Sequence, residues 1–455
     1  MAERPNILFF HVDNLGFGEL SCYSGGPLRG ATTVRIDAFA QEGFRLTNYC
    51  PESQCTPTRS ALLTGRHAIR SGTHTVAIGA SAGGWGLVAW EKSLGDLFSD
   101  AGYACAAYGK WHVGEGPGHW PTDKGFQEWY GPARTYDESL WVDDPWYDPE
   151  RDGVSRMLEI KRGERDTTER DQLTLDVRRD CDTEYLGRAE AFIRGNVEAD
   201  TPFLVYFNHS LMHFPVIPRE EFKGKSGQGD WADSLLELDG DFGVLLDLLD
   251  ELAVADNTVV VFAGDNGPDE VLLWRGTPGF WEGSLFAGGE GNLRTPCIVR
   301  WPGHVRAGEV SDEIMHVTDW FTTLLRAAGL AEPEDRVIDG INQLPWLTGE
   351  AESSQREGYI YWNGAEIYGV KWRNFKLAMV SQKFATDPPA RLSTPYIINL
   401  TVDPQEREPL TLPYVHSWTG AHFTKLLADF QTSVQREPLI PAGAPLDHVP
   451  KSAGN

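Results

Sequence analysis

The chain is organised around the stretch Cys55-Thr56-Pro57-Thr58-Arg59-Ser60-Ala61-Leu62-Leu63-Thr64-Gly65-Arg66. Cysteine, proline and arginine stand at alternate positions, and a small apolar run closed by Thr-Gly-Arg follows. Pro57 stiffens the segment because its φ is fixed and it has no N–H. Residues 60–64 favour the start of a helix, whose N-terminus attracts anions. We expect Arg59 to lie near residue 55. For Cys-x-Pro-x-Arg alone, a loop that buries an inert thiol is the alternative.

The composition limits the partners of the chain. The 455 residues suffice for about two domains, or for one large domain with an appendage. The chain has 66 acidic and 40 basic residues and a net charge of −26, so nucleic acid and anionic membranes would repel it. We therefore expect neither as a partner. Any site for an anion must be a local island of positive charge.

The first residues carry no long apolar segment of the kind that a signal peptide requires, and no apolar run approaches the length of a membrane span. We expect a cytoplasmic protein on this basis. The six cysteines are scattered without CxxC pairs, which argues against a zinc site and against a disulfide framework. The oligomeric state stays open.

Apolar runs alternate with helical patterns along most of the chain. The runs at 6–12, 103–107, 202–208 and 258–263 are typical of buried parallel strands, and helices are expected at 32–43, 90–101, 183–197, 233–252 and 318–328. This alternation predicts an α/β fold, with a large, mostly parallel sheet between helices, over residues 1–349. Short strands from residue 358 and a helix at 419–435 predict a small antiparallel sheet with a helix, a second unit at 350–455.

Polar residues follow four of the predicted strands, where α/β sheets bind ligands. They are Asp13 and Asn14, Lys110 and His112, His213, and Asp265 and Asn266. We expect them to meet at one edge of the sheet, beside Cys55 and Arg59. Either Asp-Asn pair alone could be a turn or a helix cap. Together the pairs offer oxygen ligands, which suit Ca²⁺ best and also Mg²⁺ or Mn²⁺.

These motifs resemble those of the type I sulfatases, a family with an alkaline phosphatase-like fold, and among them most resemble bacterial arylsulfatases. The matching stretches are 5–18, 55–66, 109–112, 213–215, 264–267 and 403–404. The resemblance implies that a formylglycine-generating enzyme oxidises Cys55 to formylglycine, an aldehyde. Its hydrate attacks the sulfur atom of a small sulfate ester and forms a covalent sulfo-enzyme intermediate, and the second hydroxyl later expels sulfate.

The resemblance also assigns roles to individual residues. Asp13, Asp265 and Asn266 would bind the divalent metal together with the modified Cys55, and Asn14 offers a further oxygen ligand from its position after the first strand. Arg59 and Lys110 would hold the oxygens of formylglycine and of the sulfate. His112 would take the proton of the hydroxyl that expels sulfate, and His213 would serve the leaving oxygen as a general acid. The lone His67 and His74 receive no role.

Two positions depart from the family pattern. The family usually has Asp-Asp where this chain has Asp13-Asn14, which would leave the site one unit more positive and tolerant of phosphate monoesters. It also usually has a lysine where this chain has Leu285, and Arg275 is a possible substitute cation.

The leading substrate is an aryl sulfate. Four tryptophans after the Lys110/His112 pair could line a pocket for a flat leaving group, or could simply be core: Trp120, Trp129, Trp141 and Trp146. Alkyl sulfates, sulfated sugars and sulfamates stay open. A phosphonate or phosphate ester hydrolase of the same superfamily, or an inactive protein that binds a metal or an anion, are the alternative functions.

Overall fold

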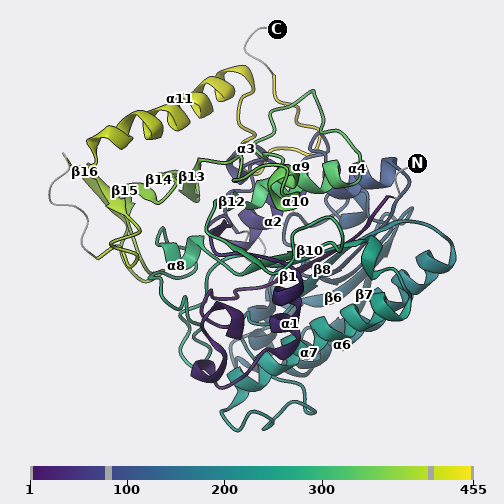
Figure 1. Ribbon diagram of the computed structural model, residues 1–455. Coiled ribbons are helices and arrows are strands. Elements are labelled where there is room, and N and C mark those ends of the chain that lie inside the picture. Colours follow the sequence, from purple (N-terminus) through teal and green to yellow (C-terminus); the bar gives the residue numbers. More distant parts are fainter. Residues whose placement is uncertain (1–3, 77–84, 408–414, 452–455) are drawn as a thin grey trace.

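The computed structural model describes residues 4–76, 85–407 and 415–451, and its centre is a ten-stranded sheet in the order β11-β2-β10-β9-β1-β8-β4-β5-β6-β7 (Figure 1). Five central strands run parallel to their neighbours. They are β9 (Thr258–Gly264), β1 (Asn6–Val12), β8 (Phe203–His209), β4 (Ala104–Gly109) and β5 (Glu128–Pro132). The predicted large, mostly parallel sheet is confirmed.

Mixed pairing extends the sheet at both edges. One edge carries β10 (Cys297–Arg300), β2 (Phe44–Leu46) and β11 (Glu309–Ser311), and the other carries β6 (Arg156–Lys161) and β7 (Thr168–Gln172). The sequence of β7 is TERDQ, and four of its five residues are exposed. Such a charged edge strand lacks the alternation that sequence reasoning requires, and it protects the sheet from edge-to-edge association.

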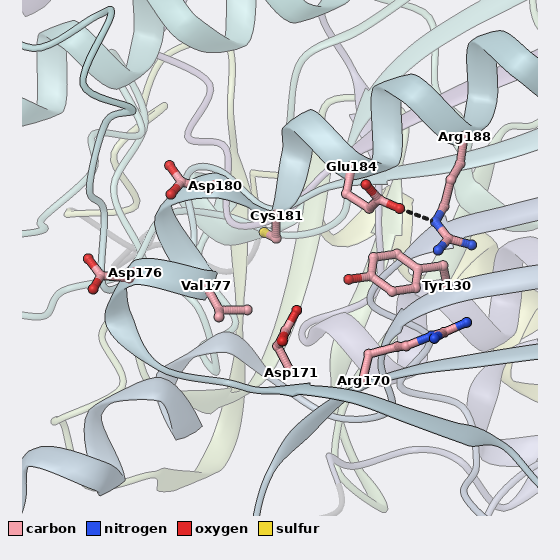
Figure 2. A pocket seen from close by; sticks show the side chains of 9 residues that line it. All are labelled: Tyr130, Arg170, Asp171, Asp176, Val177, Asp180, Cys181, Glu184 and Arg188. Carbon is pink, nitrogen blue, oxygen red and sulfur yellow. Dashed lines mark hydrogen bonds and ion pairs between the residues drawn. The ribbon is translucent and has the colours of Figure 1, made fainter.

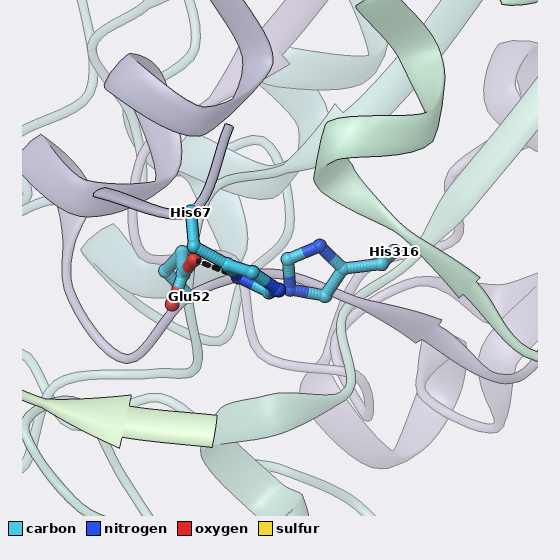
Figure 3. A group of neighbouring side chains, drawn as sticks. All are labelled: Glu52, His67 and His316. Carbon is cyan, nitrogen blue, oxygen red and sulfur yellow. Dashed lines mark hydrogen bonds and ion pairs between the residues drawn. The ribbon is translucent and has the colours of Figure 1, made fainter. Parts of the chain in front are cut away.

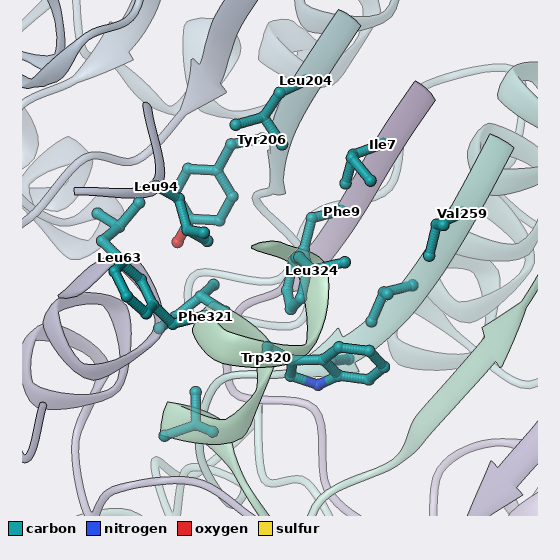
Figure 4. Packing of buried hydrophobic residues seen from close by; sticks show 14 of the residues in the cluster. Ile7, Phe9, Leu63, Leu94, Leu204, Tyr206, Val259, Trp320, Phe321 and Leu324 are labelled. Atoms are coloured by element: carbon teal, nitrogen blue, oxygen red, sulfur yellow. The ribbon is translucent and has the colours of Figure 1, made fainter. Parts of the chain in front are cut away.

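Helices cover both faces of the sheet because successive residues of its strands point to opposite sides. Ile7 and Phe9 of β1 pack with α2 (Cys55–Thr64), α4 (Leu94–Asp100) and α9 (Val317–Ala327), as Figure 4 shows for the labelled side chains. Leu8 and Phe10 face the second core, under α1 (Val34–Glu42), α6 (Leu175–Glu198) and α7 (Asp230–Glu251). None of the helices in the described residues combines the length and the apolar character that crossing a bilayer requires.

The C-terminal part forms a separate four-stranded antiparallel sheet, as predicted. Its strands are β13 (Gly358–Asn363), β14 (Glu366–Trp372), β15 (Phe375–Ser381) and β16 (Ala390–Asn399). The helix α11 (Gly420–Arg436) packs on β13 and β14 through an apolar cluster that includes Phe423 and Trp372. Shorter elements connect the layers: β3 (Tyr49–Cys50), α3 (Ala68–Ser71), α5 (Pro149–Asp152), α8 (Glu290–Leu293), β12 (Met315–His316) and α10 (Leu344–Thr348).

Local capping explains where the helices differ from the predicted bounds. The helix expected at 90–101 begins at Leu94, because Ser93 accepts a hydrogen bond from the Asp96 N–H while Asp96 accepts one from the Ser93 N–H. The helix expected at 183–197 begins at Leu175, where Thr174 caps the chain by accepting a hydrogen bond from the N–H of Val177.

A buried ionic cluster joins the small sheet to the large one. Glu290, which is fully buried, lies 2.6 Å from the ammonium of Lys371 and 2.5 Å from the guanidinium of Arg294. Lys376 lies 3.4 Å from Glu290 and 2.8 Å from Glu406. Charges that leave water cost free energy unless they are paired, so these partners depend on one another.

We predict that Glu290→Gln lowers the free energy of unfolding by about 3–5 kcal/mol, because it leaves buried cations without their shared carboxylate. Glu357→Gln is the matched control, because Glu357 and its partner Arg373 are both mostly exposed. Its loss of unfolding free energy should stay below about 1 kcal/mol. Urea unfolding of the two variants measures the difference. Equal, small losses would show that the cluster does not hold the two sheets together.

Candidate active site

The carboxyl ends of the neighbouring parallel strands β9, β1, β8 and β4 lie at one edge of the large sheet, and the first turn of α2 meets them there. The structure brings together the residues that the sequence predicted there, and each is at most 5% exposed: Asp13, Asn14, Cys55, Arg59, Lys110, His112, His213, Asp265 and Asn266. Each carboxyl end is followed directly by polar residues because the apolar run stops where the strand leaves the core.

The backbone at this edge turns sharply. Gly109 has a φ of +87°, and a Cβ there would lie 2.0 Å from the carbonyl oxygen of Asn208, so only glycine fits before Lys110. Asn14 and His112 have φ values of 53° and 55°. Left-handed backbone is uncommon outside glycine, and it is found at functional sites where surrounding contacts hold it.

Arg59 is the hub of the site. Its Nη2 donates to Oδ2 of Asp13 at 3.2 Å and to Oδ2 of Asp265 at 2.9 Å. Its Nη1 donates to Oδ1 of Asn208 at 2.7 Å and to the carbonyl oxygen of Lys110 at 3.0 Å. One planar guanidinium therefore ties together residues that follow three different strands and the last residues of a fourth.

The two carboxylates differ in their electrostatic surroundings. Burial by itself would raise the pKa of Asp13, but the ammonium of Lys110, whose Nζ lies 3.0 Å from Oδ2, and the guanidinium of Arg59 lower that pKa below its ordinary value. Burial raises the pKa of Asp265, and the neighbouring charge of Asp13 raises it further. A further positive charge next to Asp265 would therefore favour ionisation of both groups.

The donor set fits a hard divalent cation. Oδ1 of Asp13 and Oδ1 of Asn266 are buried and have no hydrogen-bond partner among the residues that the structure describes. Buried oxygens are normally satisfied, so two such atoms beside Asp265 are the kind of ligand set that Ca²⁺ or Mg²⁺ takes. A cation there would also supply the positive charge that the second carboxylate needs.

Asn14 is held from both sides. Its Oδ1 accepts from Nδ2 of Asn266 at 2.6 Å, and its Nδ2 donates to Oδ2 of Asp269 at 2.5 Å. Its backbone N–H donates to Oδ1 of Asp265 at 3.0 Å. Asp269 is buried, and burial raises its pKa to about 7. Sequence reasoning missed this carboxylate, although it stands only four residues after Asp265, because Asn-Gly-Pro-Asp is also an ordinary turn sequence.

Cys55 occupies the first turn of α2 and faces His112. Its Sγ lies 3.3 Å from Nδ1 of His112, and the hydroxyl of Thr56 donates to the carbonyl oxygen of His112 at 2.8 Å. Burial raises the pKa of Cys55 to about 11, although Lys110 opposes the shift. The unmodified residue is therefore a thiol near neutral pH and a poor nucleophile.

His213 stands next to this cluster with both ring nitrogens engaged. Nδ1 lies 2.7 Å from the carbonyl oxygen of Phe214, and Nε2 lies 2.9 Å from the hydroxyl of Thr135. A carbonyl oxygen can only accept, so Nδ1 carries the proton. Burial lowers the pKa of His213, and the ammonium of Lys110 lowers it further. The imidazole is therefore neutral before any anion binds.

The structure does not bring all candidate residues to the site. Leu285 is buried, while the side chain of Arg275 is mostly exposed and lies 3.6 Å from Glu270. A cavity of about 240 Å³ is lined by Arg275 together with Asp269. Arg275 thus borders the approach to Asp269 without contacting the buried cluster.

Core packing accounts for two of the four tryptophans. Trp120 and Trp129 are buried and stack on each other with ring centroids 5.9 Å apart. Trp141 pairs with the ring of Tyr147, and Trp146 is 85% exposed. These four residues do not line the catalytic cluster together.

A second cavity lies between α6 and the strands β5 and β7. It measures about 500 Å³, and Figure 2 shows its lining, where Nε of Arg188 donates to Glu184 at 2.6 Å. Its walls carry four carboxylates and two guanidinium groups: Asp171, Asp176, Asp180, Glu184, Arg170 and Arg188. An anionic ester is poorly suited to this cavity because negative charge dominates it.

Comparisons with known proteins agree with this geometry. The sulfatase family model matches residues 5–330, and the model for the C-terminal part of N-sulphoglucosamine sulphohydrolase matches residues 286–411. The chain belongs to the sulfatase family, and it is a sulfuric ester hydrolase.

Individual relatives resemble the chain over most of its length. Human N-acetylgalactosamine-6-sulfatase is 32% identical over 97% of this chain and 87% of its own, and human arylsulfatase A is 30% identical over 89% and 83%. The crystal structure of PsFucS1 sulfatase from Pseudoalteromonas sp. superimposes with a TM-score of 0.90 at 27% identity, covering 97% of this chain and 92% of that one.

We predict that chelation of the bound metal lowers the melting temperature and abolishes hydrolysis of sulfate esters, because Asp13 and Asp265 then lose a shared counter-charge. Differential scanning calorimetry with and without Ca²⁺ measures the shift. Asp265→Asn should show a smaller metal-dependent shift, since it removes one ligand charge. A metal-free preparation that keeps its rate would contradict the prediction.

Proposed function

We propose that the chain hydrolyses sulfate esters, with aryl sulfates as the leading substrates, by covalent catalysis from residue 55 after oxidation of Cys55 to formylglycine. The observation that carries this proposal is the position of Cys55 at the start of α2, with its Sγ 3.3 Å from Nδ1 of His112. The sulfur atom stands where an oxygen of the hydrated aldehyde would be. A formylglycine-generating enzyme would be the partner during maturation.

The cations of the site suit a sulfate group. Lys110 and Arg59 are fully buried, so their charges act in a medium of low dielectric constant, where they stabilise negative charge on a transferring group strongly. A divalent metal, which we propose is Ca²⁺ held by Asp13, Asn14, Asp265 and Asn266, would add charge stabilisation and acidify a hydroxyl of residue 55. Mg²⁺ and Mn²⁺ are the alternatives.

The proton transfers are divided between two histidines. In the first step a hydroxyl of residue 55 would lose its proton to water, and its oxygen would bond to sulfur while the bond from sulfur to the leaving oxygen breaks. His213 would protonate that oxygen. Binding of an anionic ester raises the pKa of His213, so substrate itself would convert the neutral ring into an acid. In the second step His112 would take the proton of the remaining hydroxyl, sulfate would leave, and the aldehyde would return.

An aromatic stack beside His213 supports the choice of aryl sulfates. The rings of His213 and Phe214 stack with centroids 5.1 Å apart, and Phe214 stacks on Trp274 at 6.2 Å. Flat leaving groups gain from such faces. Arylsulfatase A and steryl-sulfatase from Homo sapiens are among the relatives. Sugar sulfates are the second candidate, because N-acetylgalactosamine-6-sulfatase is also a relative.

We predict that mass analysis of the peptide 55–59 detects formylglycine in protein made with a competent maturation enzyme. Cys55→Ala should abolish turnover of 4-nitrophenyl sulfate, whereas Cys22→Ala, which alters a cysteine remote in sequence and only partly buried, should keep it. Full activity of Cys55→Ala, or a free thiol in a fully active preparation, excludes the covalent mechanism. Phenyl phosphonate and N-acetylgalactosamine 6-sulfate in the same panel test the alternatives.

We predict that His213→Ala slows phenyl sulfates with basic leaving groups by about 10²–10⁴-fold, the usual contribution of a general acid, and slows those with acidic leaving groups much less. The measurement is kcat/KM across a series that differs in leaving-group pKa. Thr135→Val, which removes a hydroxyl next to Nε2 and keeps the imidazole, should preserve the wild-type slope. Equal losses for all leaving groups in His213→Ala would rule out this role.

A further inference from the structure

The carboxylate of Glu52 and the imidazoles of His67 and His316 form a cluster that the sulfatase chemistry does not use. Oε1 of Glu52 lies 2.9 Å from Nδ1 of His67, and the rings of His67 and His316 have centroids 4.9 Å apart. One candidate ligand atom from each residue lies within 4.8 Å of the other two. Figure 3 shows the His67 ring between the Glu52 carboxylate and the His316 ring. We propose that these three residues bind a second divalent cation of the Zn²⁺ class.

His316 supplies the observation that points to a ligand. Its side chain is fully buried, and its Nε2 has no hydrogen-bond partner among the residues that the structure describes. Without a cation, its Nδ1 accepts from the N–H of Thr318 at 3.4 Å and caps α9, which leaves the ring proton on Nε2. Binding of a cation at Nε2 would move that proton to Nδ1, which could then donate to the hydroxyl of Thr318, 3.0 Å away. Burial lowers the pKa of His316 well below its ordinary value. The ring is therefore neutral, which is the form that binds a metal.

The chemistry of the donors selects the metal. Two imidazoles and one carboxylate are a common zinc set, whereas Ca²⁺ and Mg²⁺ take oxygen ligands. Ligands at about 2.0–2.1 Å from a tetrahedral zinc ion are about 3.3 Å apart, so the pair formed by Glu52 and His67 already has nearly this spacing. Side-chain shifts of roughly 1–2 Å would bring His316 into the same shell.

Besides burial, Arg356 is close enough to lower the pKa of His316, but the charged groups near the cluster are paired with one another. Arg70 donates to Asp339 from Nε at 2.7 Å, and Arg356 donates to Asp319 from Nε at 2.8 Å. Each nearby guanidinium is thus matched by a carboxylate. A cavity of about 240 Å³ borders the cluster on one side, where His67 lines it together with Arg70 and Asp339. The cation would keep a fourth position open toward this cavity.

Such an ion would fasten the helix that begins at Cys55. Glu52 precedes α2 and its N–H donates to the hydroxyl of Thr58 at 3.0 Å, while His67 follows the end of α2. His316 immediately precedes α9, which packs on α2. The site is independent of the proposed Ca²⁺ site because it shares no residue with it. The absence of CxxC pairs argues against a cysteine-based zinc site and says nothing against a site made of histidine and glutamate.

Zinc binding to the full-length protein tests the proposal, with excess Ca²⁺ present to fill the oxygen-rich site. Isothermal titration with ZnCl₂ should detect one ion that His316→Asn weakens by at least about tenfold; this variant keeps a side-chain acceptor for the cap of α9. Glu52→Gln should weaken binding as well. His304→Asn removes an exposed histidine and is the matched control, with wild-type affinity expected. Zn²⁺ should raise the melting temperature of wild type and not of His316→Asn.

Any of three results would overturn the inference. The first is a folded wild type that binds no zinc, the second is a His316→Asn variant that binds zinc as tightly as the wild type, and the third is a His304→Asn variant that loses as much zinc affinity as His316→Asn. Co²⁺ in place of Zn²⁺ gives an independent reading, since a charge-transfer band from thiolate would place the ion on cysteine instead. If His316→Asn does not fold, Glu52→Gln decides; if neither folds, anomalous scattering at the zinc edge from wild-type crystals shows whether the ion lies between these three side chains.

Discussion

The site depends on one buried guanidinium. Arg59 reaches from α2 to the carboxylates of Asp13 and Asp265, which follow neighbouring parallel strands, and to Asn208 on the next strand. Two carboxylates without water would repel each other and would be expensive to bury, so Arg59 and Lys110 make their juxtaposition tolerable. In the mechanism that we propose, the same two side chains would also hold the sulfate group.

Much of this arrangement could be predicted from the sequence because two simple rules converge on it. Continuous apolar runs identify parallel strands, and the residues that follow them lie at the ligand-binding edge. Asp13, Lys110 and Asp265 were placed by these rules alone. The helix expected to start at residues 60–64 in fact begins at Cys55, so Cys55 and Arg59 are four residues apart on one face of it. The antiparallel C-terminal sheet was also predictable, since its strands are short and separated by turn residues.

Other features depend on contacts between distant segments, which no local pattern reveals. In the sequence, Asn208 is only a polar residue near the end of an apolar strand. Its role as a partner of Arg59 becomes visible in the fold alone. Glu52 and His316 are 264 positions apart, and only the packing of α9 on α2 places His316 beside His67. The strand β7 was missed for a different reason: its charged, exposed residues carry no hydrophobic period, and pairing with β6 alone defines it.

The position of Asp269 changes what Asn14 implies about the charge of the site. From the sequence, an amide in place of the family's usual second aspartate leaves the site one unit more positive. In the fold, however, Oδ2 of Asp269 lies 2.5 Å from Nδ2 of Asn14. Asp269 can therefore carry a negative charge next to Asn14, although Asn14 itself is neutral. Because burial raises the pKa of Asp269 to about 7, this charge is partial near neutrality and grows as the pH rises. The charge at this side of the site therefore depends on Asn14 and Asp269 together and not on residue 14 alone.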